Sequence, residues 1–373
     1  MMSREIEEKT ERLVEMLERE KLSGVLLNGQ HNFAWITGGA NNGIDRSREN
    51  GAASVLVTNK GRRYLLANNI EMPRMLAEEV SSALFEPFEF AWQDEKASGT
   101  FLTDATAKIS GGKVATDLVL NPTVRAIDGL IAEFRHSLTE EEITRYRVLG
   151  KDAAAAIDGV VDRLRPRMTE LAIAGMMRHE LAGRLIESVV TLVAIDDRIS
   201  RFRHPVPTRK GLGKTILFVT CAKRTGLIAS LSRIVTLGEP PAELLEKTEA
   251  AAFVNAKLLA ATRPGATGAD LYLVAKNAYE AVGFPGQIDK HHQGGAAGYR
   301  TRDWVAHPRG GDIVKRNQAF AWNPSITCTK VEQTVIVTDD GIETLTTSSK
   351  FPALTHRIDG REFRSPGVLS IQV

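Results

Sequence analysis

Apolar and polar positions in the first third of the chain follow two different spacings. Between residues 6 and 17, apolar side chains recur every three or four positions among charged ones, which predicts a helix. Apolar runs with turn residues between them then predict strands, and these are expected at residues 24–27, 33–39, 53–58 and 63–67. The turn composition of Asn59-Lys-Gly61 favours a hairpin between the last two. With helices expected near 73–80 and 124–134, this region is predicted to be a small α/β domain of residues 1–135.

The pattern changes after residue 135, where a second domain of residues 136–373 is predicted to begin. Thr139-Glu-Glu-Glu142 has the composition of a capping box, in which Thr139 and Glu142 satisfy each other's backbone amides and start a long helix. Thr169 is expected to cap a second helix. Strands are then predicted at 188–195, 216–220 and 228–235, helices at 240–261 and 268–282, and further strands at 318–322, 330–338 and 343–345. The second domain is thus predicted to run helix, helix, strands and then again helix, helix, strands. This doubled order fits an internal structural duplication.

Composition limits the class of protein. A charged content of 25% and a net charge of +2 are too balanced to indicate a nucleic-acid surface. No apolar run reaches the ~18 residues that a membrane span needs, and the charged start predicts no secretory signal. We therefore expect a soluble cytoplasmic protein that binds neither nucleic acid nor membrane. Cys221 and Cys328 lie in apolar, strand-like runs, which predicts two buried thiols and no disulfide.

Several segments, taken in order, carry a resemblance to a known family. They are Leu138-Thr-Glu-Glu-Glu-Ile143, Arg203-His-Pro205, the run of residues 215–233, His291-His-Gln-Gly-Gly-Ala-Ala-Gly-Tyr-Arg300 and Val331-Glu-Gln-Thr-Val-Ile-Val337. Together they resemble the pita-bread family of methionine aminopeptidase, aminopeptidase P, prolidase and creatinase. The resemblance implies an α/β (α+β) fold, with a small creatinase-type N-terminal domain and a C-terminal pita-bread domain. It also implies a homodimer with the active site near the subunit interface.

Most members of that family hold two divalent metals with two Asp, one His and two Glu. When the chain is aligned on Gly226 and Arg233, the ligand positions become Val219, Ser230, Gly295, Asn323 and Glu332. Hard divalent metals need several oxygen or nitrogen donors, so the resemblance implies no dinuclear centre, and we expect no metal and no other cofactor. His291 or His292 could still replace a missing ligand and hold a single metal.

Creatinase, a member without metal, suggests chemistry for the remaining polar residues. His204 matches its pocket histidine, and imidazole can take and return a proton near neutral pH. We therefore predict His204 as the general base and acid, with Glu332 and His292 as further catalytic residues. The predicted substrate-binding residues are Arg48, His291, Arg300, Arg302, Asn323, Ser230 and Ser232.

The predicted pocket is rich in arginine and histidine and poor in acids, which favours a small anionic carboxylate as substrate. Arginine pairs bidentately with carboxylates, and the resemblance to creatinase implies that Arg48 does so across the dimer interface. The main hypothesis is a metal-independent, creatinase-like hydrolase that cleaves a C–N bond, with a lyase as a close variant. Two alternatives stay open: a metalloenzyme similar to Xaa-Pro peptidases, and a non-catalytic binding protein on a degenerate peptidase scaffold.

Overall fold

The computed structural model describes residues 2–372, which form two compact units. The first unit ends at Glu142 and the second begins at Ile143. This division falls inside the first turns of α7 (Glu140–Val161), whereas the predicted boundary lies at the end of α6 (Asp128–Arg135). No helix within residues 2–372 is long and apolar enough to cross a membrane.

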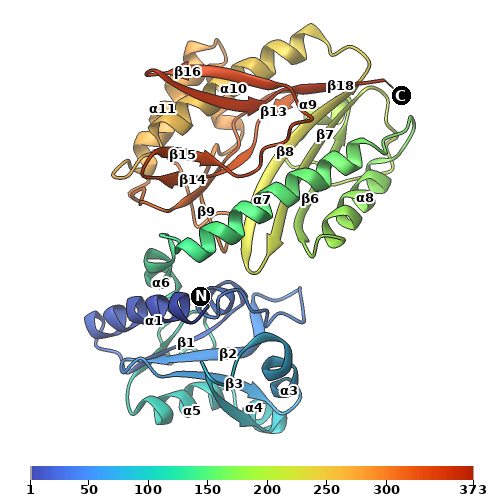
Figure 1. Ribbon diagram of the computed structural model, residues 1–373. Coiled ribbons are helices and arrows are strands. Elements are labelled where there is room, and N and C mark those ends of the chain that lie inside the picture. The colour runs from blue at the N-terminus through green and yellow to red at the C-terminus, as the bar shows by residue number, and fades with distance from the viewer. Residues whose placement is uncertain (1, 373) are drawn as a thin grey trace. The chain divides into compact units, whose positions relative to one another are not determined.

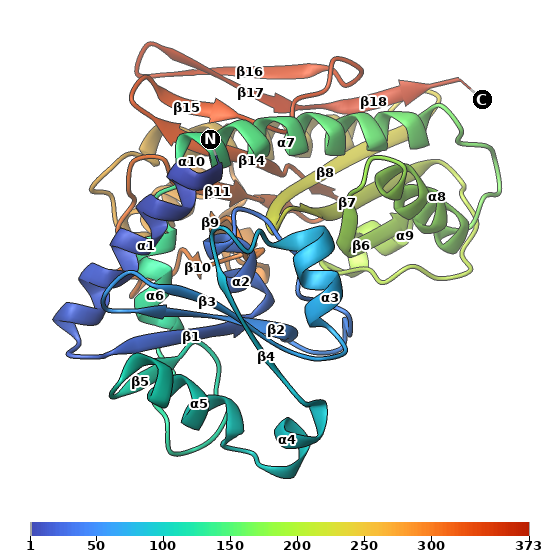
Figure 2. The ribbon, with the colours of Figure 1, turned by 60° about the horizontal axis from the view of Figure 1, so that its bottom comes forward.

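The N-terminal unit is built on one five-stranded sheet with the spatial order β4-β3-β2-β1-β5. Its strands are β1 (Gly24–Gly29), β2 (Asn50–Thr58), β3 (Arg63–Asn68), β4 (Glu86–Phe90) and β5 (Val114–Thr116). The three central strands lie side by side in Figure 2 and pair antiparallel. The hairpin predicted at Asn59-Lys-Gly61 is confirmed, because it joins β2 to β3.

Helices of this unit are α1 (Met2–Arg19), α2 (Gln30–Ile36), α3 (Met72–Arg74), the π-helix η1 (Met75–Glu79), α4 (Trp92–Ala97), α5 (Phe101–Ser110) and α6. The prediction of a strand at 33–39 was wrong, because residues 30–36 form α2. The side chains of residues 31–36 are all buried, including the polar ones of His31 and Asn32, so the helix has no solvent-exposed face. Without an exposed polar face, helical periodicity is invisible in the sequence, and Phe, Trp and Ile then favour a strand.

Both predicted helix caps are present. The amide of Thr139 donates to Oε2 of Glu142 over 2.7 Å, and the amide of Glu142 donates to Oγ1 of Thr139 over 3.3 Å. The hydroxyl of Thr169 accepts from the amide of Ala172 and caps α8 (Glu170–Ala182). Because each cap satisfies amides that a helix start leaves open, local sequence alone locates the start of these helices.

The C-terminal unit contains a first sheet in the order β18-β8-β7-β6. Its strands are β6 (Glu187–Ile195), β7 (Thr215–Arg224), β8 (Leu227–Leu237) and β18 (Val368–Ile371). Helix α8 packs on β6, and the short helix α9 (Asp197–Arg201) follows that strand. Figure 1 shows α8 beside β6, with α7 running along the same part of the unit.

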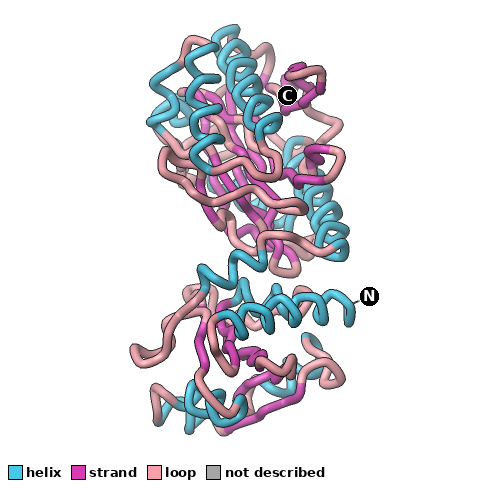
Figure 3. The backbone as a smooth tube through the Cα atoms, turned by 90° about the vertical axis from the view of Figure 1, so that its left-hand side faces the viewer, coloured by secondary structure: helices cyan, strands magenta, loops and turns pink. Residues whose placement is uncertain are grey.

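A second sheet follows the order β10-β9-β11-β14-β15. Its strands are β9 (Gly294–Ala297), β10 (Trp304–Val305), β11 (Ala319–Trp322), β14 (Gln333–Thr338) and β15 (Gly341–Thr344). Helices α10 (Ala242–Ala261) and α11 (Gly268–Ala281) pack on each other, and the 3-10 helix η2 (Pro285–Lys290) leads into β9. Figure 3 shows helices on the outside of the strands of this unit. Two small pairs complete it, β12 (Ser325–Ile326) with β13 (Thr329–Lys330) and β16 (Ala353–Ile358) with β17 (Arg361–Pro366).

The two sheets of the C-terminal unit meet where β8 approaches the start of β14. Ser232 and Glu332 form an isolated antiparallel bridge there, and the amide of Ser230 donates to Oγ1 of Thr334 over 2.7 Å. Residues of both sheets that carried the family resemblance are therefore brought together. Cys221 is buried as predicted, but Cys328 is only half-buried, in the turn between β12 and β13; both thiols are free.

Candidate functional site

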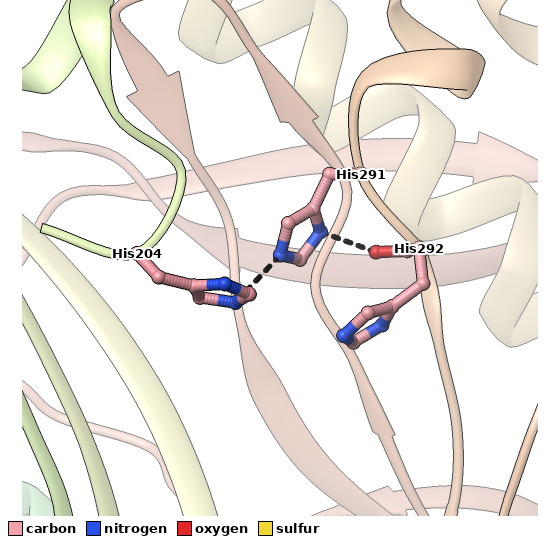
Figure 4. Close-up of side chains that lie close together, drawn as sticks. All are labelled: His204, His291 and His292. Atoms are coloured by element: carbon pink, nitrogen blue, oxygen red, sulfur yellow. Dashed lines mark hydrogen bonds between the residues drawn. The ribbon is translucent and has the colours of Figure 1, made fainter.

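Three histidines gather at one point of the C-terminal unit (Figure 4). His204 lies in the loop between α9 and β7, whereas His291 and His292 lie between η2 and β9. The Nε2 atoms of His204 and His291 are 3.1 Å apart, and the rings of His291 and His292 stack with centroids 4.4 Å apart. One potential ligand atom from each of the three lies within 4.8 Å of the others. We call these residues the histidine cluster.

Hydrogen bonds from neighbouring residues hold the two loops of the cluster. Arg203 donates from Nη2 to Oε1 of Gln287 over 2.7 Å and to Oγ1 of Thr327 over 3.1 Å, which fixes the backbone before His204 against η2. The hydroxyl of the buried Tyr279 donates to Oε1 of Gln293 over 2.6 Å, and the amide of Gln293 donates to the carbonyl of His291. Side chains of the surrounding core thus position the cluster.

The histidines of the cluster are neutral near pH 7. Burial, and then the positive charge of Lys330, lowers the pKa of His291 to about 3 and also lowers the pKa of His204. Burial, followed by the charges of Arg302 and Lys330, lowers the pKa of His292 to about 4, although part of this residue is exposed to solvent. Neutral imidazole is the form that accepts a proton or binds a metal.

Next to the cluster lies a buried carboxylate with two cationic partners. Oε1 of Glu332 is 3.2 Å from Nη2 of Arg302, and Oε2 is 3.7 Å from Nζ of Lys330 and 2.5 Å from the hydroxyl of Ser232. Burial would raise the pKa of Glu332, but the charges of Lys330 and Arg302 lower it overall, so the carboxylate is ionised. A buried carboxylate requires such partners. We call Glu332, Arg302 and Lys330 the charged group.

The five positions aligned with the family's metal ligands do not fit two divalent metals. Val219 packs in an apolar cluster with Leu217 and Ile234. The hydroxyl of Ser230 donates to Sγ of Cys221 over 3.3 Å. Both oxygens of Glu332 are engaged by the charged group and Ser232. These side chains leave one acid in place of four.

The remaining two aligned positions, Gly295 and Asn323, are constrained by backbone contacts as well as by the side chain. A β carbon on Gly295 would lie 2.1 Å from the carbonyl oxygen of Trp304, so no side chain fits there. Asn323 is buried, and its amide nitrogen in the backbone donates to the carbonyl of Gln293 over 2.9 Å. The histidine that the family has at the first position is thus replaced by a residue without a donor, and the glutamate at the second is replaced by a neutral amide.

The other predicted binding residues lie in different surroundings. Arg300 follows β9, is partly buried, and accepts a hydrogen bond at its backbone carbonyl from Gly298 over 3.2 Å. Arg48 belongs to the N-terminal unit, where its Nε is 3.0 Å from Asp45 and it lines a cavity of about 250 Å³. The predicted role of Arg48 across a dimer interface stays a prediction.

Two residues of the site were not predicted from the sequence. Lys330 precedes Glu332 by two positions, and side chains two apart in an extended segment lie on the same face, so this spacing could have indicated it. Arg203, next to His204, gives no such local signal, because its partners Gln287 and Thr327 are distant in sequence.

Comparison with family models agrees with this architecture. Residues 144–339 match the model described as Metallopeptidase family M24, which is more than half of the chain. The chain belongs to metallopeptidase family M24. Residues 9–165 of this M24 chain match the Creatinase/Prolidase N-terminal domain. The expected fold class is confirmed: a mixed α/β protein with a creatinase-type N-terminal domain and a C-terminal pita-bread domain.

Two curated relatives of the M24 chain are named Xaa-Pro dipeptidases. The protein from Lactobacillus helveticus is 26% identical over 235 residues, which covers 60% of this chain and 63% of the relative. The protein from Lactobacillus delbrueckii subsp. lactis is 25% identical over the same length and the same shares. The matched part is thus less than two thirds of the length of these relatives.

Solved structures share the fold of the M24 chain. The prolidase from Pyrococcus horikoshii OT3 has a TM-score of 0.73 at 18% identity and covers 92% of this chain and 99% of its own. The dipeptidase PepE from Mycobacterium ulcerans has a TM-score of 0.76 at 15% identity and covers 100% of both chains. The N-terminal domain of the FACT complex subunit SPT16 from Cicer arietinum has a TM-score of 0.68 at 11% identity over 92% of this chain and 96% of its own. At such identities the likeness concerns the fold alone.

Proposed function

We propose that the chain is a hydrolase that cleaves an amide-type C–N bond in a small compound carrying a carboxylate. The observation that carries the proposal is that the neutral histidine cluster lies next to the charged group, which is buried and has a net positive charge. Membership in metallopeptidase family M24 and relatives named Xaa-Pro dipeptidases support the choice of bond. Dipeptides ending in proline are therefore the first class to test.

The charged group favours an anionic substrate. Arg302 and Lys330 carry two positive charges against the single carboxylate of Glu332, so a negatively charged ligand would balance the excess. Within residues 2–372 the buried Nε–H of Arg302 has no hydrogen-bond partner. Its Nη1 donates to the carbonyl of Thr301 and its Nη2 donates to Glu332, so a substrate carboxylate would bind Arg302 through Nε, as a charge-assisted hydrogen bond. Arg300 and, across a dimer interface, Arg48 remain predicted anchors for the same group.

Two ways of activating water are open to this centre. In the metal-independent way, neutral His204 takes a proton from water, the hydroxide adds to the carbonyl carbon, and the proton returns to the leaving nitrogen when the C–N bond breaks. Glu332, Ser232 and Asn323 would orient the reactants. The names of the relatives favour the alternative, a metalloenzyme similar to Xaa-Pro dipeptidases.

The test is hydrolysis of Ala-Pro, of Ala-Ala and of an N-acylated amino acid, followed by chromatography of the released products. We expect at least one of these substrates to be hydrolysed, and we expect its amidated counterpart, which lacks the carboxylate, to be hydrolysed poorly. Arg302→Met should lower kcat/KM by roughly 100-fold, because a charged hydrogen bond to the substrate is lost. Arg309→Met, at an exposed position, is the matched control.

Each outcome bears on the proposal. Hydrolysis that is indifferent to the substrate carboxylate and to Arg302→Met would refute the assignment of the charged group. Absence of turnover with every amide, both after treatment with chelator and after addition of Zn²⁺, Mn²⁺ or Co²⁺, would refute the hydrolase and leave the non-catalytic binding protein.

A further inference from the structure

We propose that His204, His291 and His292 together bind a single divalent transition metal, with Zn²⁺ as the first candidate. This is a different site from the five aligned family positions, which hold one acid, and it uses no residue of that set. The inference concerns the reactive centre of the proposed hydrolase and deepens that proposal. Metal binding is nevertheless measured without turnover, so either claim can fail while the other stands.

Distances within the histidine cluster are close to those of a coordination shell. Zn–N bonds of ~2.0–2.1 Å in a tetrahedral site place two ligand nitrogens about 3.3 Å apart. The Nε2 atoms of His204 and His291 are already 3.1 Å apart. The third ligand atom lies within 4.8 Å of both, and it belongs to His292, which is exposed and whose ring stacks on that of His291. The three potential ligand atoms thus lie only slightly farther apart than the nitrogens of a tetrahedral site.

The hydrogen bonds of His291 orient its lone pair toward the cluster. Its Nδ1 contacts the backbone carbonyl of His292, and because a carbonyl can only accept, Nδ1 carries the proton. Nε2 of His291 therefore has a lone pair, which accepts a hydrogen bond from the Nε2–H of His204 over 3.1 Å (Figure 4), and a bound metal would take the place of that proton. A ligand histidine typically donates its other ring N–H to a carbonyl or carboxylate in this way.

The loops that carry the ligands are held from outside the cluster. The bonds of Arg203 to Gln287 and Thr327 tie the His204 loop to η2, the helix that ends just before His291. Gln293, itself bound by Tyr279, holds the carbonyl of His291. His291 is only 9% exposed, so this ligand is fixed before any metal arrives. Such preorganisation lowers the entropic cost of binding.

The donor set selects the class of metal. Three imidazole nitrogens suit Zn²⁺ and its neighbours in the transition series, whereas Mg²⁺ and Ca²⁺ require oxygen ligands. Within residues 2–372 the cluster contains no carboxylate. The carboxylate of Glu332 is engaged by Arg302, Lys330 and Ser232 and serves to offset their positive charge near the metal. Three protein ligands leave a position open, and a metal in such a site activates bound water.

Zn²⁺ binding to the protein of residues 1–373, stripped with chelator and dialysed, tests the inference by isothermal titration calorimetry. We expect one equivalent of Zn²⁺ to bind and no heat from Mg²⁺. Co²⁺, used as a spectroscopic substitute, should give the visible absorption of a low-coordinate site. His291→Ala should weaken Zn²⁺ binding by about 100-fold or more, and His204→Ala should weaken it similarly. His179→Ala, on the exposed face of α8, is the matched control.

Circular dichroism of the metal-free variants shows whether each is folded, so that loss of binding is not confused with loss of structure. Arg203→Gln gives a second, milder perturbation, which leaves all three ligands and removes the tie to η2; it should weaken Zn²⁺ binding by roughly tenfold. The inference is overturned if the wild-type protein binds no Zn²⁺, or if one equivalent binds equally well to folded His291→Ala. Tight Zn²⁺ binding without hydrolysis would leave the metal site standing and refute the proposed function.

Discussion

Replacing Gly295 by alanine tests whether this chain could regain the histidine that its family uses as a metal ligand. Gly295 lies in β9, between β10 and β11. A β carbon there would meet three backbone atoms of β10: the carbonyl oxygen of Trp304 at 2.1 Å, the Cα of Val305 at 2.8 Å and the carbonyl carbon of Trp304 at 2.9 Å. Backbone atoms of a paired strand cannot rotate away as the end of a side chain can, so the strands must move apart.

The expected cost follows from this contact. Extra carbon atoms forced into a packed interior typically cost ~1–3 kcal/mol, and a clash with backbone on a paired strand belongs at the upper end. At ~2–4 °C per kcal/mol for a domain of this size, Gly295→Ala should lower the melting temperature by about 6–12 °C. Gly175→Ala is the matched control, because a β carbon there meets nothing within 4 Å. Gly175 lies inside α8, where alanine is favoured over glycine by ~0.5–1 kcal/mol.

Thermal unfolding followed by circular dichroism, in the presence of chelator, gives both values without a contribution from bound metal. We expect a clear loss of stability for Gly295→Ala and none for Gly175→Ala. A melting temperature of Gly295→Ala within 2 °C of wild type would show that β9 and β10 accept a side chain at this position. In that case the steric argument fails, and Gly295→His would be a feasible return to the family's ligand.

Further predictions concern buried charges of the two units. Glu332→Gln should destabilise the protein by roughly 3 kcal/mol, because it leaves Arg302 and Lys330 buried without a carboxylate. In denaturant titrations, the double variant Glu332→Gln with Lys330→Met should recover part of this loss. If the free-energy changes of the two single variants simply add, the proposed coupling between Glu332 and Lys330 is wrong. Asp128→Asn should cost about 2 kcal/mol at neutral pH, because the carboxylate accepts hydrogen bonds from His31 over 2.9 Å and from Asn32 over 2.8 Å. Burial would raise the pKa of Asp128, but the hydrogen bond from His31 and the charge of Arg135 lower it well below its usual range. The stabilising effect of the Asp128 carboxylate is therefore present above about pH 4 and is lost as the pH falls. The free energy of unfolding of the wild type should thus fall more steeply below pH 4 than that of Asp128→Asn. Parallel pH dependences of the two proteins would contradict this.

Local rules were enough for much of the fold. The capping box at Thr139, the cap at Thr169 and the turn after β2 depend on neighbours within a few residues, so the sequence located them. Helix α2 was mistaken for a strand because burial on all sides removes the polar face on which periodicity depends. No element was predicted after residue 345, although β16, β17 and β18 lie there. Strand β18 pairs with β8, more than a hundred residues earlier, and local pattern cannot reveal such a partner.

The sequence by itself determined the ordered motifs that resemble the family and the residues that stand at its five metal-ligand positions. Both depend on spacing and residue identity, which are local properties of the chain. The sequence also indicated His204, His291, His292, Arg302 and Glu332 as separate candidates. Only the tertiary structure showed that the three imidazoles lie together and that Lys330 and Arg302 are ion-pair partners of Glu332. It alone showed that the backbone of β10 leaves no space for a side chain at Gly295. Each of these is a distance between atoms on different loops or strands, and packing of the two sheets, rather than order along the chain, sets such distances.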